Sequence, residues 1–461
     1  MPIWTAKTSL LDGGLAAEAR DTSSLPARGL VQPEMVPRQC RLAGYLPRQI
    51  SPVVVRSDII AYASPDSTYA VTKQLFDEAK RSILIGIYDF TAPHMKQLVL
   101  DALARGVRVA LMLDIDGADE DKLFDELVDV GVEGVSAPSC ANKNIHLFAS
   151  SHEKVIVIDD EWTLVQSGNY SANSIPLNEA DGLAGPQFRT GNRDAGLAVR
   201  SRPLAKLFTG ILRSDMQAST DAPAVAQPEA EAAQATQVLL ERAPSKRPSK
   251  LFPSKHFQLD AGLRVQPVLS PDNYMSVVPP LIAAATTSID IEQQYIKAHQ
   301  PEVRTLLEAI ASARSARPGL KVRIILGRVF SRADLDAEHR NLKLLADDFA
   351  LKLGTHIRYI NTDRLVHCHN KMIVVDDAKV LVSSQNWSDF AVTKNREAGL
   401  WVPHSGIAQY FGAVFDTDWG TAFKTPDQIF AGPGATPESL APEALGAGGF
   451  IKVEPGDYQE V

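Results

Sequence analysis

Short apolar runs alternate along the chain with segments whose apolar residues recur at helical spacing. In the first such segment, Val71, Leu75 and Ala79 lie on one face of a predicted helix. The run SILIGIYDF from Ser82 follows, and it is typical of a buried strand. The same alternation continues through both halves of the chain, so the pattern predicts an α/β sandwich in each half.

The alternation defines a set of expected elements. A helix over 94–105 ends at Gly106, a residue type that favours helix C-termini. The other expected helices are 119–130, 204–213, 274–285 and 302–314, and the expected strands are 107–113, 154–159, 163–168, 194–199, 289–296, 322–326, 372–375, 380–383 and 399–402.

Six sequence blocks occur twice, in the same order in the two halves. The offset between the copies runs from 203 residues (Asn192 to Asn395) to 217 residues (His152 to His369). Such a series indicates an internal duplication. The pairs are SPD at 64 and 270, SILIGIYDF at 82 and SIDIEQQYI at 288, VRVALML at 107 and VRIILG at 322, HEKVIVIDD at 152 and HNKMIVVDD at 369, SGNYS at 167 and SQNWS at 384, and NRDAGL at 192 and NREAGL at 395.

Composition places the boundaries of the two halves. The segment between them is rich in Ala, Pro, Gln and Glu and ends in a basic stretch, which predicts either a solvated tether or a contact for phosphate-bearing surfaces. The expected organisation is an irregular N-terminal arm over 1–50, a first lobe over 51–217, a flexible linker over 218–256, a second lobe over 257–425 and a flexible tail over 426–461.

Each half contains the pattern His-x-Lys-x4-Asp, followed ten residues later by Asn. On a strand, His and Lys two positions apart point to the same face, and the apolar residues that follow anchor the strand in a core. The polar pair therefore lies at the start of a buried strand. The residues are His152, Lys154, Asp159, Ser167 and Asn169 in the first half, and His369, Lys371, Asp376, Ser384 and Asn386 in the second.

These residue types suit the chemistry of a phosphodiester. Lysine supplies a positive charge and asparagine a neutral donor to the phosphate oxygens, and such electrostatic stabilisation is much of phosphoryl-transfer catalysis. A neutral histidine can attack phosphorus and form a covalent phosphohistidine, while a protonated one donates to the leaving oxygen. Two motifs would then build one site. A zinc site is not expected, because His367 and His369 alone lack the remaining ligands.

A reacting histidine needs a partner that fixes its tautomer. The repeated NR-acid-AGL segment makes Asp194 and Glu397 the candidates, 42 residues after His152 and 28 after His369 in their own halves. Glu179 and Asp181 in the insertion of the first half are rivals to Asp194.

The paired motifs resemble the HKD motifs of the phospholipase D superfamily, over roughly residues 55–425. The resemblance implies two α/β/α lobes that meet at a pseudo-two-fold interface, with no metal or other cofactor. It implies that Asp159 and Asp376 support the structure, together with Ser167 and Ser384. It also implies that His152 is the nucleophile and His369 the acid. Ser384-Gln385 replaces the small pair that family members often carry, which would reshape the second half of the phosphate site.

Charge and cysteine content refine the expected function and location. A net charge of −8 and a pI near 5.7 weaken the case for strong non-specific nucleic-acid binding. Three cysteines without a CxxC pair fit a reduced compartment, and we read no signal peptide or membrane-spanning run, so a cytoplasmic protein is expected.

The expected function is hydrolysis of a phospholipid head-group phosphodiester, with a peripheral membrane contact and the site between the lobes of a monomer. A nuclease that cleaves DNA or RNA, and a phosphatidyltransferase of the cardiolipin synthase type, are the enzyme alternatives. A protein that only binds is disfavoured because both copies of His, Lys and Asn are intact.

Overall fold

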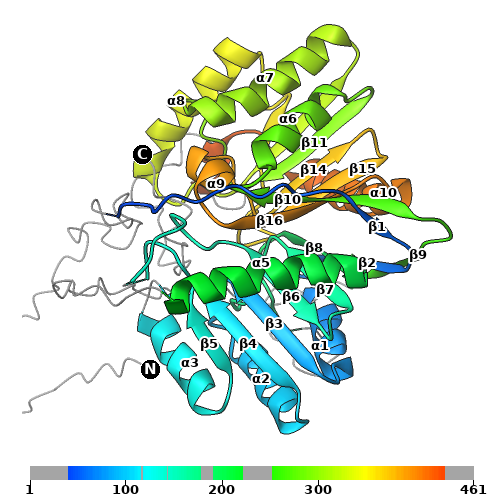
Figure 1. Ribbon diagram of the computed structural model, residues 1–461. Coiled ribbons are helices and arrows are strands. Elements are labelled where there is room, and N and C mark those ends of the chain that lie inside the picture. The colour runs from blue at the N-terminus through cyan, green and yellow to red at the C-terminus, as the bar shows by residue number, and fades with distance from the viewer. Residues whose placement is uncertain (1–39, 116–117, 143, 178–190, 222–251, 431–461) are drawn as a thin grey trace, which may run out of the picture.

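Two eight-stranded mixed sheets form the protein, and helices cover them on both faces (Figure 1). The computed structural model describes residues 40–115, 118–142, 144–177, 191–221 and 252–430. The expected pair of similar α/β/α sandwich lobes is confirmed. The rival residues Glu179 and Asp181 lie outside the described residues.

The first sheet belongs mainly to the first half of the chain. Its strand order is β5 (Glu133–Ser136), β4 (Arg108–Leu113), β3 (Ser82–Ile87), β6 (Lys154–Ile158), β7 (Trp162–Gln166), β8 (Asp194–Arg200), β2 (Asp58–Ser64) and β9 (Lys255–Gln258). Its helices are α1 (Thr68–Glu78), α2 (Pro93–Ala104), α3 (Ala118–Asp129) and α5 (Arg202–Asp221).

The second sheet repeats this arrangement. Its strand order is β1 (Val53–Val55), β10 (Leu263–Ser270), β16 (Glu397–Val402), β15 (Lys379–Ser383), β14 (Lys371–Val375), β11 (Ser288–Gln293), β12 (Lys321–Leu326) and β13 (Ile357–Tyr359). Its helices are α6 (Tyr274–Ala283), α7 (Pro301–Ala316), α8 (Arg332–Phe349), α9 (Asp389–Thr393) and α10 (Ser405–Thr421), followed by the 3-10 helix η3 (Pro426–Phe430).

Three hydrophobic cores lie among the described residues, one in each lobe and one between the lobes. Helices α1 and α2 pack on the outer face of the first sheet, and α6, α7 and α8 pack on the outer face of the second. The third core lies between the sheets and combines side chains of α5 and α10 with strands of both lobes (Figure 1). Strand β6 shows the division, since Val155 and Val157 belong to the central core, whereas Ile156 and Ile158 belong to the outer one. Burial on both faces explains its unbroken apolar sequence.

Each sheet is completed by a strand that adjoins the other lobe in sequence. Strand β1 directly precedes β2 of the first sheet, yet it pairs antiparallel with β10 of the second. Strand β9 directly precedes β10, yet it pairs antiparallel with β2. The exchange ties the two sheets together through the chain. Helix α5 and η3 also extend beyond the expected lobe ends at 217 and 425, and Ile429 and Phe430 pack against the second core.

Several elements differ from those expected. The short strands β1, β5, β9 and β13 and the long helix α8 were not predicted, nor were β2 and β10. The block VRVALML also aligns differently in space, because Arg108 pairs with Ser82 whereas Lys321 pairs with the equivalent Ser288. The structural equivalence is therefore two residues away from the sequence alignment, a shift that keeps the same side chains on each face.

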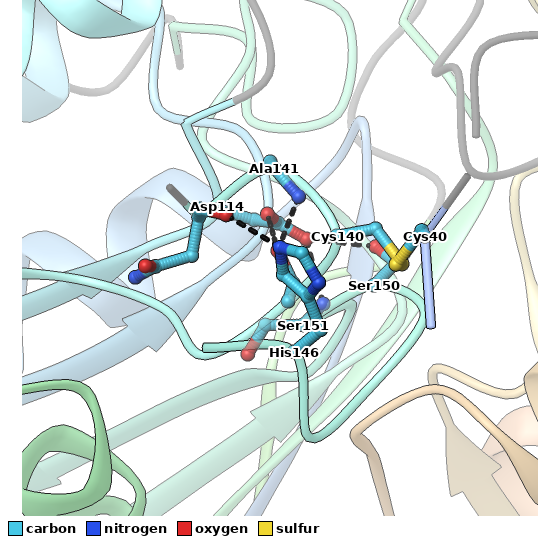
Figure 2. Close-up of a disulfide and its surroundings, with 9 residues drawn as sticks. Cys40, Asp114, Cys140, Ala141, His146, Ser150 and Ser151 are labelled. Carbon is cyan, nitrogen blue, oxygen red and sulfur yellow. Dashed lines mark hydrogen bonds between the residues drawn. A yellow bond between two sulfur atoms is a disulfide. The ribbon is translucent and has the colours of Figure 1, made fainter. Parts of the chain in front are cut away.

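A disulfide joins Cys40 to Cys140, whose Cα atoms lie 5.8 Å apart (Figure 2). The expectation of reduced cysteines was wrong for these two, while Cys368 is free and buried. Disulfides persist mainly in oxidising compartments, which weighs against the reduced setting expected from the cysteine count. None of the helices in the described ranges combines the length and the apolar character that a bilayer crossing requires.

Candidate active site

The two motif histidines lie immediately before the central strands β6 and β14. His152 and His369 are 1% and 2% exposed, and the lysines that begin the two strands are equally buried. Lys154 Nζ donates to the carbonyl of His152 at 2.8 Å, and Lys371 Nζ donates to the carbonyl of His369 at 2.9 Å. Each lysine therefore folds back beside its own histidine, at a strand end that meets the other lobe.

Each motif histidine is hydrogen bonded to an acid of the other half. His152 Nδ1 lies 2.9 Å from Glu397 Oε2, and His369 Nδ1 lies 2.9 Å from Asp194 Oδ1. Both predicted acids therefore meet a motif histidine, but counting them from the histidine of the same half was misleading. An ionised carboxylate only accepts, so these contacts select the tautomer with the proton on Nδ1 and leave Nε2 as the reactive nitrogen.

Main-chain hydrogen bonds between the lobes hold each acid beside the histidine of the other half. The His152 N–H donates to the Arg396 carbonyl at 2.8 Å, and the Arg396 N–H donates to the Ser150 carbonyl at 2.8 Å. On the other side, the His369 N–H donates to the Arg193 carbonyl at 3.0 Å. Each NR-acid segment therefore runs beside the motif of the opposite half, with its acid placed behind the imidazole.

The two motif serines hold the acids. Ser167 Oγ donates to Asp194 Oδ1 at 2.8 Å and accepts from the Ala195 N–H at 3.0 Å. Ser384 Oγ donates to Glu397 Oε2 at 2.5 Å and accepts from the N–H of the residue after Glu397 at 3.0 Å. The serines thus hold the carboxylates in place, and the carboxylates orient the histidines. Ser167 and Ser384 therefore support the site.

The motif asparagines are also buried at this interface. Asn169 is fully buried, and neither atom of its amide has a hydrogen-bond partner among the described residues. Asn386 is 1% exposed. Buried amide groups are normally paired, so the amide of Asn169 is suited to a ligand with oxygen atoms. Gln385, which replaces a small residue of the family pattern, donates through its amide to the Val268 carbonyl at 3.3 Å.

The motif aspartates lie at the far end of the same strands, at the turns into β7 and β15. Asp159 has φ +54° and Asp376 has φ +57°, a left-handed conformation that Asp tolerates. Burial raises the pKa of Asp376, but hydrogen bonds from the backbone N–H groups of Thr287, Ser288 and Thr286 outweigh it and set the pKa near 2. Asp159 accepts three backbone N–H bonds in the same way. This geometry is that of a structural carboxylate.

Two buried arginines at the lobe interface were not predicted. Arg193 donates to Asp418 of α10 and to the Ser64 carbonyl at 2.6 Å each. Arg396 donates to Asp215 of α5 at 2.8 Å and to Asp272 at 2.6 Å. The signal was present in the sequence, because the arginines belong to the repeated NR-acid-AGL block and Asp272 to the repeated SPD block.

Two buried glutamates flank the motifs at exchanged positions. Glu153 follows His152, and Gly86 on the neighbouring strand leaves room for its side chain. In the second half, Asn370 follows His369 and donates to Glu292, which takes the position of Gly86. Burial raises the pKa of both carboxyls to about 8. Burial therefore favours the protonated form of both carboxyls.

The described residues contain no group of three or more His, Cys, Asp or Glu side chains arranged to hold a metal ion. In the segment His367-Cys368-His369, Nδ1 of His367 accepts from the Arg328 N–H at 2.9 Å, and the rings of His367 and His369 lie 6.3 Å apart. Cys368 is fully buried and belongs to the central core.

Comparison with known proteins places this geometry in a family. The sequence model of the family described as cardiolipin synthase, PLD-like domain, matches residues 72–215 and 279–419. A comparison with curated proteins gave no significant match.

Three solved structures align with the chain. Phosphatidylserine synthase from Haemophilus influenzae Rd KW20 aligns with a TM-score of 0.55 at 16% identity, covering 82% of this chain and 91% of that one. Polyphosphate kinase from Porphyromonas gingivalis aligns with a TM-score of 0.48 at 12% identity, covering 78% and 50%. Nuc from Salmonella typhimurium, described as a phospholipase D family member, aligns with a TM-score of 0.28 at 21% identity, covering 36% and 95%.

The family match falls on both motif-bearing halves and together covers more than half of the chain. The synthase shares the fold over most of both chains, at an identity that shows the fold alone. The chain therefore belongs to the phospholipase D superfamily, with its PLD-like domain duplicated.

Proposed function

We propose that the protein cleaves phosphodiesters through a phosphohistidine intermediate, with one active site made from both halves. The observation that carries the proposal is the crossed pairing of His152 with Glu397 and of His369 with Asp194. Since each half supplies the acid for the histidine of the other, neither half holds a complete catalytic pair alone. Reactive imidazoles with Nδ1 fixed by a carboxylate are what nucleophilic and acid catalysis by histidine requires.

The proposed reaction has two displacements. Nε2 of His152 attacks phosphorus, the bond from phosphorus to the leaving oxygen breaks, and the leaving oxygen takes the proton from His369. His369 then removes a proton from water, the water oxygen attacks phosphorus, and the bond from phosphorus to Nε2 breaks. Lys154, Lys371 and Asn169 would stabilise the phosphate oxygens through charge and hydrogen bonds. Asn386 would do the same from the second half.

A phospholipid head-group diester is the proposed substrate. The description of the matched family names cardiolipin synthase, and one solved structure with the same fold is a phosphatidylserine synthase. An alcohol can discharge the same phosphohistidine in place of water, so phosphatidyl transfer is the second candidate. A nuclease is the third, and the net charge of −8 counts against tight binding of nucleic acid.

The substrate class can be tested with a panel. Purified protein is incubated with phosphatidylcholine or phosphatidylglycerol vesicles, with bis(4-nitrophenyl) phosphate and with single-stranded DNA, each with and without added glycerol. Release of choline or glycerol with phosphatidic acid supports hydrolysis, and a new phosphatidyl ester with glycerol supports transfer. Cleavage of DNA alone supports a nuclease, and no turnover of any diester rejects the proposed function.

A further inference from the structure

The described part of the N-terminal arm, residues 40–50, contacts the loop between β5 and His152 at three points; we call this loop the motif loop. Cys40 forms its disulfide with Cys140 (Figure 2). The Ala43 N–H donates to the His146 carbonyl at 2.7 Å. The ring of Tyr45 packs edge-on against Phe148 at 5.0 Å between centroids. We call residues 40–50 the clasp.

The clasp reaches the arginine that stands beside the active site. Tyr45 OH accepts from Arg396 NH2 at 2.9 Å and donates to Asp272 Oδ1 at 2.8 Å. The Arg48 N–H donates to the same Oδ1 at 2.6 Å. Arg396 also lies over the rings of Phe148 and Tyr45, at 4.2 and 5.0 Å. The hydroxyl of Tyr45 therefore completes a partly buried hydrogen-bond network around the Arg396 guanidinium.

Arg396 directly precedes the acid that orients His152. Its carbonyl accepts from the His152 N–H, and the next residue is Glu397, the partner of His152 Nδ1. A shift of the guanidinium would move the main chain that carries Glu397. The clasp is thus connected to the imidazole of His152 through one residue.

The motif loop gives a second connection. Beyond Cys140, the loop is held by Asp114, which accepts from Ser150 Oγ at 2.9 Å and from the Ser151 N–H at 2.6 Å (Figure 2). Ser151 directly precedes His152. The disulfide therefore ties the clasp to the loop that leads into the first motif.

The other half has no counterpart of the clasp among the described residues. Arg193 is held by Asp418, Asp66 and the Ser64 carbonyl, none of them in residues 40–50. Its stacked ring is Phe252, at 5.3 Å. The clasp, through Tyr45 and Arg48, thus breaks the pseudo-symmetry of the two arginine networks, and Tyr45 is the clasp residue that contacts the guanidinium itself.

We infer that Tyr45, held in place by the Cys40–Cys140 disulfide, is a positioning residue for His152 and not for His369. The inference rests on the proposed function for its catalytic consequence. The clasp fixes Arg396, Arg396 fixes Glu397, and Glu397 sets the orientation of the His152 imidazole. The orientation of the His152 imidazole therefore depends on the clasp, and the orientation of the His369 imidazole does not.

The test is ¹⁵N-histidine NMR of the full chain, which detects the Nδ1–H protons bonded to Glu397 and Asp194. His152→Gln and His369→Gln assign the two signals. Tyr45→Phe keeps the ring and removes the hydroxyl, and it should shift or broaden the His152 signal alone. Cys40→Ser and reduction of the wild type should do the same. With a diester that the wild type turns over, the kcat of Tyr45→Phe should fall about 10-fold, which corresponds to the loss of one hydrogen bond to a charged group. The KM of this variant should stay within about twofold of the wild-type KM.

Tyr410→Phe is the matched control, because Tyr410 is a buried tyrosine of α10 without a hydrogen bond to Arg193 among the described residues. It should leave the His152 signal in place. An unchanged His152 signal in both Tyr45→Phe and Cys40→Ser overturns the inference, as does an equal shift of both histidine signals. If the wild type turns over no diester, the proposed function fails, and the NMR signals still decide the role of Tyr45.

Discussion

The two halves of the chain keep the same catalytic residues but differ in the buried acid beside them. In the first half, Glu153 directly precedes β6 and its side chain lies next to Gly86 of β3, and in the second half, Glu292 of β11 takes the glycine position and accepts from Asn370. The acid has moved to the neighbouring strand and still occupies the space between the same two strands. Each half therefore keeps a buried carboxyl beside its motif, supplied from a different position in the two halves.

The halves are also alike in needing each other. Each histidine takes its acid from the opposite half, and each buried arginine joins an aspartate of its own half to one on a helix of the other. A change in one half should therefore appear in the chemistry of the other. This dependence separates an interlocked pair of lobes from two lobes that only touch.

The largest expected effect comes from removing either histidine. His152→Ala and His369→Ala should each lower turnover by roughly 10³- to 10⁶-fold, as loss of a nucleophile or its acid does. Phosphohistidine should still form slowly in His369→Ala with a good leaving group and should not form in His152→Ala. Acid-quenched labelling with ³²P-diester measures this. Near-normal turnover in either variant would contradict the paired mechanism, and label on His369 alone would reverse the roles.

The next prediction tests whether each acid serves the histidine of the other half. Glu397→Gln and Asp194→Asn keep the shape of the acids but lose the charge that selects the tautomer, and each should lower kcat by about 10²- to 10⁴-fold. The Nδ1–H signal lost in Glu397→Gln should be that of His152, and the signal lost in Asp194→Asn should be that of His369. Loss of the same-half signal instead would show that the acids serve their own halves.

Much of this site could be predicted because its residue types occur in both copies of the duplicated sequence. His, Lys, Asn, Ser and the acids recur in both halves with the same neighbours, and the apolar runs after the motifs fix β6 and β14 as buried strands. The pairing of the acids could not be predicted from spacing. Asp194 and Glu397 lie 42 and 28 residues from the histidine of their own half, but 175 and 245 residues from the histidine that they contact. Only the meeting of strand ends across the interface decides which histidine each one contacts.

The missed parts of the fold have physical reasons as well. Strands β1, β9 and β13 have only three or four residues, too few to show a period, and their pairing is with distant segments. The helix α8 is polar along much of its length and gave little apolar pattern. The Cys40–Cys140 disulfide joins residues 100 apart in sequence, and spacing alone does not reveal such a contact.

A third prediction compares the two arginine networks by stability. Arg396→Met and Arg193→Met each leave two buried carboxylates without their cation, which should cost about 3–5 kcal/mol of unfolding free energy. Arg200→Met is the control, because Arg200 pairs with Glu161 at the surface and is 47% exposed, so its loss should cost about 1 kcal/mol or less. Urea unfolding measures all three. A loss for Arg396 or Arg193 no larger than that for Arg200 would show that these networks do not hold the lobes together.

The last prediction, whose effect is small for each unit of pH, concerns the buried glutamates Glu153 and Glu292. Burial raises the folded-state pKa of Glu153 and Glu292 from 4.5 to about 8, so the folded protein keeps protons that the unfolded chain has released. Their contribution to stability is fully present below about pH 4.5 and declines as pH rises towards 8, with a slope of at most about 1.4 kcal/mol per pH unit for each group.

Glu153→Gln and Glu292→Gln should each reduce this decline, and the double variant should flatten it further. Unfolding free energies between pH 5 and pH 8 measure the slope, with Glu308→Gln, an exposed position on α7, as the control. Equal reductions from the two single variants would show that Glu153 and Glu292 contribute equally to the pH dependence of stability. A reduction from only one would show that the halves have diverged at this place, and an unchanged slope in the double variant would contradict the raised pKa values.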